Sequence, residues 1–119
     1  MSEDILEQKI HKIREIGLKH AKASKDRTYL EHSRHILLAK LMKEHMVNSN
    51  TGKLDSVSSQ NREARADPRY EAHIKGLAEA VEEELKWEWE KFIIRMNFES
   101  WKTKVINLGK EKKDYGVKK

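Results

Sequence analysis

Asp67, Glu84 and Lys86 match the D…ExK spacing of metal-dependent nucleases, which would cleave a phosphodiester with a bound divalent ion. That chemistry needs carboxylates that converge on one ion. Here a single predicted helix would hold Asp67 and Glu84 about 25 Å apart, at a rise of about 1.5 Å per residue. We therefore interpret these residues as part of a solvated helix face.

The histidines are candidate ligands for a metal ion. His32 and His35 lie three residues apart, Glu31 precedes His35 by four, and His73 is conceivable as a third ligand for a divalent metal. A usable site needs three convergent ligands, and exposed histidines that add partial positive charge below a pKa of about 6.5 are the simpler interpretation. We predict no metal site and no cofactor. With no glycine-rich phosphate loop, no nucleophile elbow and no cysteine, we predict that the protein is not an enzyme.

Basic residues are more informative, because charge is sorted along the chain. Lysine and arginine dominate 9–45 and 102–119, whereas acidic residues dominate 63–90. Basic side chains spread over several helical turns can follow a phosphate backbone, and a tyrosine among them can stack on an unpaired base. The predicted DNA-binding residues are Lys19, Lys22, Lys25, Arg27, Tyr29, Arg34, Lys110, Lys112 and Lys113. A solvated helix face and a solvated tail are the alternative.

The composition predicts the elements that carry these residues. Charged residues make up 38% of the chain, with five glycines and one proline, which is typical of long helices. We predict an all-α protein, a long antiparallel helical hairpin of the coiled-coil type. Its first helix covers about 3–47, a connector 48–58, and a second helix about 59–109. Pro68 restarts that helix after the capping residue Asp67, and 110–119 form a flexible basic tail.

The second helix carries apolar residues on more sides than one partner helix can cover. We therefore predict a homo-oligomer. Aromatic residues in this region could stack on bases, but their spacing favours packing. The predicted interface is Leu85, Trp87, Trp89, Phe92, Ile94, Phe98, Trp101 and Val105.

Three segments resemble a group of small all-helical phage proteins that are encoded among DNA recombination and replication functions. They are SKDRTYLEHSRHILLAKLMKE (24–44), NREARADPRYEAHIKGLAEAVEEE (61–84) and FESWKT (98–103). The predicted architecture is also similar to that of the phage recombination mediator UvsY. The resemblance implies an oligomer that binds single-stranded DNA and helps to load a recombinase, with a recombinase or a single-strand-binding protein as its partner.

We expect a non-enzymatic single-stranded DNA-binding accessory protein of phage recombination or replication. The alternative is a coiled-coil structural, adaptor or assembly protein that does not bind nucleic acid. No segment approaches the roughly 20 apolar residues of a membrane span, so we expect no membrane partner and a cytoplasmic location, in the host cell if a phage encodes the protein.

Overall fold

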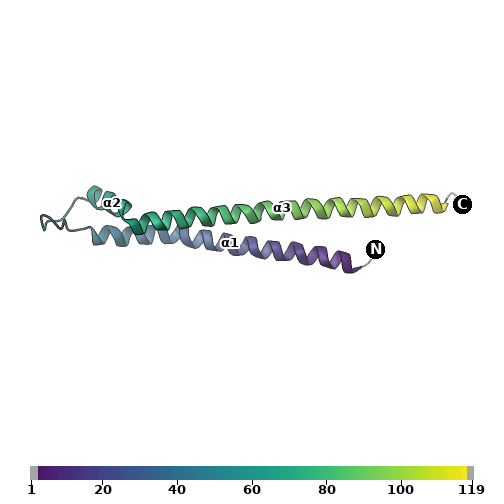
Figure 1. Ribbon diagram of the computed structural model, residues 1–119, viewed down its shortest axis with the longest axis horizontal. Coiled ribbons are helices and arrows are strands. Elements are labelled where there is room, and N and C mark those ends of the chain that lie inside the picture. The colour runs from purple at the N-terminus through teal and green to yellow at the C-terminus, as the bar shows by residue number, and fades with distance from the viewer. Residues whose placement is uncertain (1–2, 118–119) are drawn as a thin grey trace. The chain divides into compact units, whose positions relative to one another are not determined.

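The computed structural model describes the backbone of residues 3–117 and the side chains of residues 4–110. Figure 1 shows its three helices, which are α1 (Glu3–Glu44), α2 (Val57–Ala66) and α3 (Pro68–Val117). The described residues contain no β-strand. The prediction of an all-α protein is confirmed.

The helix bounds differ from the expected ones mainly at the C-terminus. Helix α3 continues to Val117, whereas the sequence predicts an end near Gly109. The described residues have a single glycine with a positive φ, Gly52, so Gly109 does not adopt the left-handed conformation that commonly ends a helix. A glycine inside a helix costs only about 1 kcal/mol, and the residues around it, Leu108 and Lys110, are good helix formers.

The chain forms two compact units, and both long helices contribute to each. Unit 1 comprises residues 1–20 and 86–119, and unit 2 comprises residues 21–85. In unit 2, Arg27 contacts Glu84, whereas Leu30, later in α1, contacts His73, earlier in α3. The α1 and α3 segments of unit 2 are therefore antiparallel.

Unit 1 is also an antiparallel pair of helix segments, held by amphipathic contacts. The Lys9 amine lies 5.1 Å from the centroid of a Trp101 ring, and the Lys19 amine 4.9 Å from that of a Trp87 ring. Each lysine can place its cation against an aromatic face while its aliphatic stem packs against the neighbouring helix.

The connector between α1 and α2 is a hydrogen-bonded loop. The Asn48 amide donates to the Lys53 carbonyl, and the Gly52 amide donates to the Asn48 carbonyl, both at 2.8 Å. The Asn48 side-chain oxygen also accepts from the Asn50 amide at 2.8 Å. Gly52 has a φ of +68°, which a residue with a Cβ rarely adopts, so this glycine permits the turn.

Helix α2 closes the end of unit 2. Ser56 caps it by accepting a hydrogen bond from the Ser59 amide at 3.2 Å. Gln60 is buried, and its side-chain amide donates to the Asp55 carbonyl at 2.9 Å, which satisfies that donor. Ala64 is fully buried, and Leu41 of α1, only 1% exposed, is the largest fully buried side chain among the described residues.

Asp67 and Pro68 explain why the chain breaks between α2 and α3. Asp67 has an extended backbone, with φ −66° and ψ 131°, as expected before a proline. Pro68 is the first residue of α3, where its missing amide costs no helical hydrogen bond. The Asp67 carboxylate instead accepts from the Arg69 amide at 2.8 Å and so caps α3.

An ion-pair cluster joins this cap to the end of α1. The Arg69 guanidinium donates to Asp67 Oδ2 at 2.9 Å and also to the carboxylate of Glu44, the last residue of α1. His45 Nε2 lies 3.5 Å from Asp67 Oδ2. The Arg69 side chain, by hydrogen bonding, lowers the pKa of Asp67 well below its usual range. The cluster therefore fixes where α3 begins relative to the end of α1 in unit 2.

Leu41 tests whether this thin interior determines stability. Leu41→Ala should lower the free energy of unfolding by about 2–4 kcal/mol, because it removes a buried side chain and leaves a cavity. The matched control is Leu18→Ala, at a leucine of the same helix that is 66% exposed, which should change stability by less than about 1 kcal/mol. Urea unfolding followed by circular dichroism measures both. Equal losses would contradict the assigned core.

Asp67 tests the ion-pair cluster through pH. A lowered carboxyl pKa stabilises the folded state above the unfolded pKa of about 3.9, and this stability is lost as the pH falls below that value. Between about pH 7 and about pH 3, the melting temperature of Asp67→Asn should fall less than that of the wild type. Asp26→Asn is the control, because Asp26 is an exposed residue of α1 with no ion pair to a described residue. A profile for Asp67→Asn that parallels the wild type would contradict this role.

Candidate nucleic-acid interface

One face of α1 in unit 2 carries a row of exposed residues that we call the basic stripe. Successive members are three or four residues apart, so they lie along one side of the helix. The helix makes this face available because another side of α1, which includes Leu30 and Leu41, is turned toward α3 and the interior. The basic stripe consists of Lys22, Lys25, Tyr29, His32, Ile36, Lys40 and Lys43.

The basic stripe contains four lysines and no acidic residue. Among the described residues, none of the four lysine amines forms an ion pair. Two of the acidic residues in this part of α1 are already engaged, Glu31 with Arg27 and Glu44 with Arg69. A third, Asp26, is exposed and follows Lys22 by four residues, so it offsets part of the charge at that end of the stripe, and the remaining positive charge is open to a ligand.

A shallow groove of about 670 Å³ lies along the stripe. Tyr29, Ile36 and Lys40 line it from the stripe, and Leu30, Leu37 and His73 complete it. The Tyr29 side chain is 71% exposed, so one aromatic ring stands at the groove with little covering it. The groove thus combines an apolar surface with a lysine at its edge.

His73 positions the α3 side of this groove. Its Nε2 atom lies 2.8 Å from the Leu30 carbonyl oxygen and 3.4 Å from the Ser33 hydroxyl. Because a carbonyl can only accept, Nε2 carries a proton and donates it to Leu30. This hydrogen bond joins α3 to α1 across unit 2 and holds the imidazole against the groove.

The residues predicted from the sequence to bind DNA have different environments in the structure. Lys22, Lys25 and Tyr29 belong to the basic stripe, whereas Arg27 donates to Glu84 and to Glu31, each at 2.6 Å. The hydrogen bond that Arg27 donates to Glu84 raises the pKa of Arg27 further. A phosphate would have to displace both carboxylates, so Arg27 acts first as a link between α1 and α3.

The other predicted contacts lie outside the stripe. Arg34 is half-buried, and Lys19, in unit 1, lies beside Trp87 and 3.5 Å from Glu15. Lys110 is exposed on α3. Lys112 and Lys113 lie outside the residues whose side chains the structure describes.

His32, Ile36, Lys40 and Lys43 are not among the residues predicted from the sequence to bind DNA. A signal for them exists, because they continue the three- and four-residue spacing that begins at Lys22. Counting basic residues within a window cannot reveal that continuity, since it does not distinguish the faces of a helix.

The predicted oligomer interface divides between two faces of α3. Trp87, Ile94, Phe98, Trp101 and Val105 are half-buried, and Ile94 and Phe98 line a pocket of about 310 Å³ with Ile13 of α1. These residues serve the packing of unit 1. By contrast, Trp89 and Phe92 of unit 1 and Leu85 of unit 2 are exposed.

The residues whose spacing suggested a metal site do not lie together in the structure. Asp67 is paired with Arg69 and Glu84 with Arg27, so both carboxylates hold helices in place. His32 and His35 are exposed. Within residues 4–110, no three histidine or carboxylate side chains are grouped closely enough to hold a metal ion.

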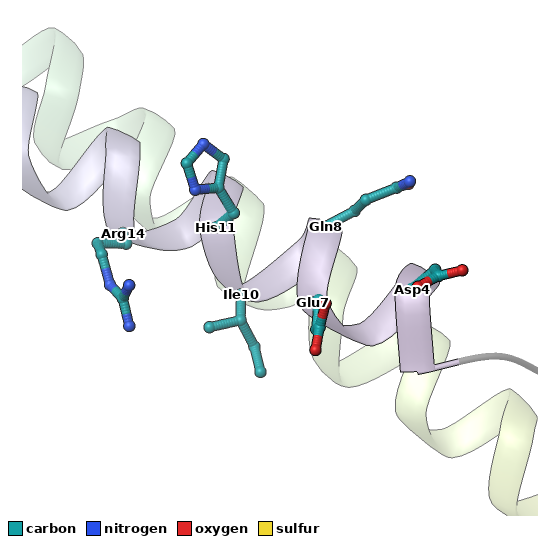
Figure 2. Close-up of a pocket in the computed structure, with 6 residues that line it drawn as sticks. All are labelled: Asp4, Glu7, Gln8, Ile10, His11 and Arg14. Carbon is teal, nitrogen blue, oxygen red and sulfur yellow. The ribbon is translucent and has the colours of Figure 1, made fainter.

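A further hollow near the N-terminus involves α1 alone. Its lining residues are Asp4, Glu7, Gln8, Ile10, His11 and Arg14. Figure 2 shows that Glu7, Ile10 and Arg14 point to one side of the helix, whereas His11 points to the other. Side chains that spread around one helix cannot enclose a ligand, so this hollow is an open helix surface.

None of the helices, over the residues that the structure describes, contains a stretch both long and apolar enough to cross a membrane. Comparison with protein-family models, with curated proteins and with solved structures finds no match to this chain, so its own residues are what bear on its function.

Proposed function

We propose that the protein is a non-enzymatic accessory protein that binds single-stranded DNA through the basic stripe of α1, in the cytoplasm of the cell where the DNA is processed. The observation that carries this proposal is the stripe itself, with four exposed lysines that form no ion pair with a residue of 4–110, an exposed tyrosine and no acidic residue. A protein that neutralises phosphates releases their condensed counterions, which favours binding to any polyanion of suitable length.

The length of the stripe suits a strand rather than an isolated phosphate group. Residues 22 to 43 span about 32 Å of helix at about 1.5 Å per residue. Lysine amines on flexible stems can follow a strand over this distance without fixed geometry. The expected binding is therefore electrostatic, tolerant of base sequence and sensitive to salt.

The groove beside Tyr29 supports a preference for unpaired bases. In a duplex, the faces of the bases are covered by stacking, whereas a single strand can turn a base outward onto an aromatic ring. Tyr29 is exposed enough to receive one, and Ile36 and Leu37 offer apolar surface beside it. Lys40 at the same groove could pair with the adjacent phosphate.

The setting in phage recombination or replication follows from the sequence resemblance. A mediator of that kind would hold single-stranded DNA in a form that a recombinase can occupy. Its protein partner would be the recombinase or a single-strand-binding protein, and its work would be positioning rather than bond chemistry.

We also propose that the chain is a homo-oligomer. Trp89, Phe92 and Met96 lie on one side of α3 in unit 1, and each is more than half exposed. Large apolar side chains grouped in this way usually mark a contact surface. The same observation favours the second candidate function, a coiled-coil adaptor or assembly protein whose lysines only keep it soluble.

The lysines of the stripe should determine how binding depends on salt. Lys22→Ala/Lys25→Ala should weaken binding to a single-stranded oligonucleotide and reduce the slope of log affinity against log salt by about 1.4, at about 0.7 per phosphate contact. The matched control, Lys53→Ala/Lys75→Ala, removes two exposed lysines of unit 2 that lie outside the stripe and should leave the slope unchanged. Fluorescence anisotropy at several salt concentrations measures both. Failure of the wild type to bind at low salt would favour the adaptor.

Tyr29 should contribute through its ring and not through charge. Tyr29→Ala should reduce affinity for single-stranded DNA about 5- to 150-fold, since stacking on an aromatic ring contributes about 1–3 kcal/mol per base, and it should leave the salt slope unaltered. Tyr29→Phe is the control and should bind as the wild type does. An abasic oligonucleotide of equal charge should bind the wild type and Tyr29→Ala equally. Normal affinity of Tyr29→Ala for the base-containing strand would exclude stacking at this position.

A further inference from the structure

The exposed apolar face of α3 in unit 1 has a pattern that specifies how it pairs. Trp89, Phe92 and Met96 follow one another at spacings of three and four residues, as core positions of a coiled coil do. Their exposed fractions are 62%, 53% and 58%. The Trp89 and Phe92 rings are stacked, with centroids 5.6 Å apart, so they present one continuous aromatic surface.

Helix α1 does not cover this face. The residues of α3 that meet α1 in unit 1, among them Trp87, Ile94 and Trp101, lie on another side of the helix and are half-buried. A single partner helix covers only one stripe of its neighbour, so the face of Trp89, Phe92 and Met96 stays open to a further helix.

Two opposite charges flank the exposed face. Glu88 directly precedes Trp89, and Arg95 directly precedes Met96, so both occupy the same heptad position, called g, seven residues apart. Both are exposed, and among the described residues neither takes part in an ion pair. Charges at such flanking positions set the partner and the orientation of a coiled coil.

These charges distinguish the two orientations of a pair of identical helices. In a parallel pair, Glu88 would face Ile93 of the second copy and Arg95 would face Ser100, which gives no charge pair. In an antiparallel pair, g faces g, so Glu88 of each copy faces Arg95 of the other and two ion pairs form. The same register places Trp89 of one copy against Phe92 of the other, which keeps the apolar core in step.

We propose that two copies of this chain associate antiparallel through the α3 face of Trp89, Phe92 and Met96, with reciprocal ion pairs between Glu88 and Arg95. The inference rests on the proposed self-association and adds its partner surface and orientation. It is independent of DNA binding.

Charge reversal tests the orientation. Glu88→Arg alone, or Arg95→Glu alone, should weaken the dimer by roughly tenfold, because two exposed pairs change from attraction to repulsion. The double variant Glu88→Arg/Arg95→Glu should restore the wild-type dissociation constant. Lys104→Glu is the control, since it makes the same change in net charge as Arg95→Glu at an exposed position of α3 away from this face. Sedimentation equilibrium measures all of them.

Cysteine cross-linking gives a second readout, because the chain contains no cysteine of its own. A mixture of Glu88→Cys and Arg95→Cys should form a mixed disulfide faster than either variant alone forms its own. Trp89→Glu should be monomeric.

Three results would overturn the inference in different ways. A monomeric wild type would remove self-association altogether. A dimer that survives Trp89→Glu would mean that another surface is used. A dimer that depends on Trp89 but shows no rescue in the double variant and no mixed disulfide would exclude the antiparallel register while leaving the proposed self-association intact.

Discussion

A helix that packs against a single partner can bury only one stripe of its surface, and this constraint determines the character of the molecule. In each unit, a segment of α1 packs against a segment of α3, so there is little interior to fill. Among the described residues, Leu41 is the largest side chain that is fully buried, and α2 contributes the buried residues Gln60 and Ala64 to the same unit. The remaining faces of α1 and α3 are open to water or to a partner. The surface residues therefore indicate more about the function of this protein than its core residues do.

Because the interior is thin, hydrogen bonds and ion pairs largely determine how α1 and α3 are aligned in unit 2. The bonds from Arg27 to Glu84 and from His73 to the Leu30 carbonyl connect the two helices at separate points of unit 2. The cluster of Arg69, Asp67 and Glu44 sets the point at which α3 begins. Exposed ion pairs add little free energy one by one, but they favour one register over its neighbours, since a slip of one turn would leave each charge without its partner. These charges connect helices, whereas pairs such as Lys19 with Glu15 lie within one helix and the lysines of the basic stripe pair with no described residue.

Features that depend on neighbouring residues could be predicted from the sequence, whereas contacts between distant residues could not. Helical spacing, few breakers and the Asp67–Pro68 pair were enough to predict an all-α chain in which α3 begins at the proline, because these features act locally. Tyr29, Lys22 and Lys25 could be found by composition. The ion pair of Arg27 with Glu84 could not be predicted from the sequence. Glu84 is distant from Arg27 in sequence and becomes its neighbour only when α1 packs against α3. The predicted interface was divided for the same reason: Trp87 and Trp89 are nearly adjacent in sequence, yet only the choice of the face that packs against α1 decides which one is left exposed.

The basic stripe of α1 and the exposed apolar face of α3 would both contribute to DNA binding if the protein binds DNA as a dimer. Four lysines and one aromatic ring would form only a modest binding surface, since electrostatic, sequence-independent contacts to DNA typically give dissociation constants of about 10⁻⁴ to 10⁻⁶ M at physiological salt. A dimer would carry two basic stripes, so a strand long enough to reach both would make the second contact at a raised effective concentration without any new residue. Self-association through α3 would then raise the affinity for a long strand, and it would use none of the residues of the basic stripe, because Trp89, Phe92 and Met96 belong to a different helix.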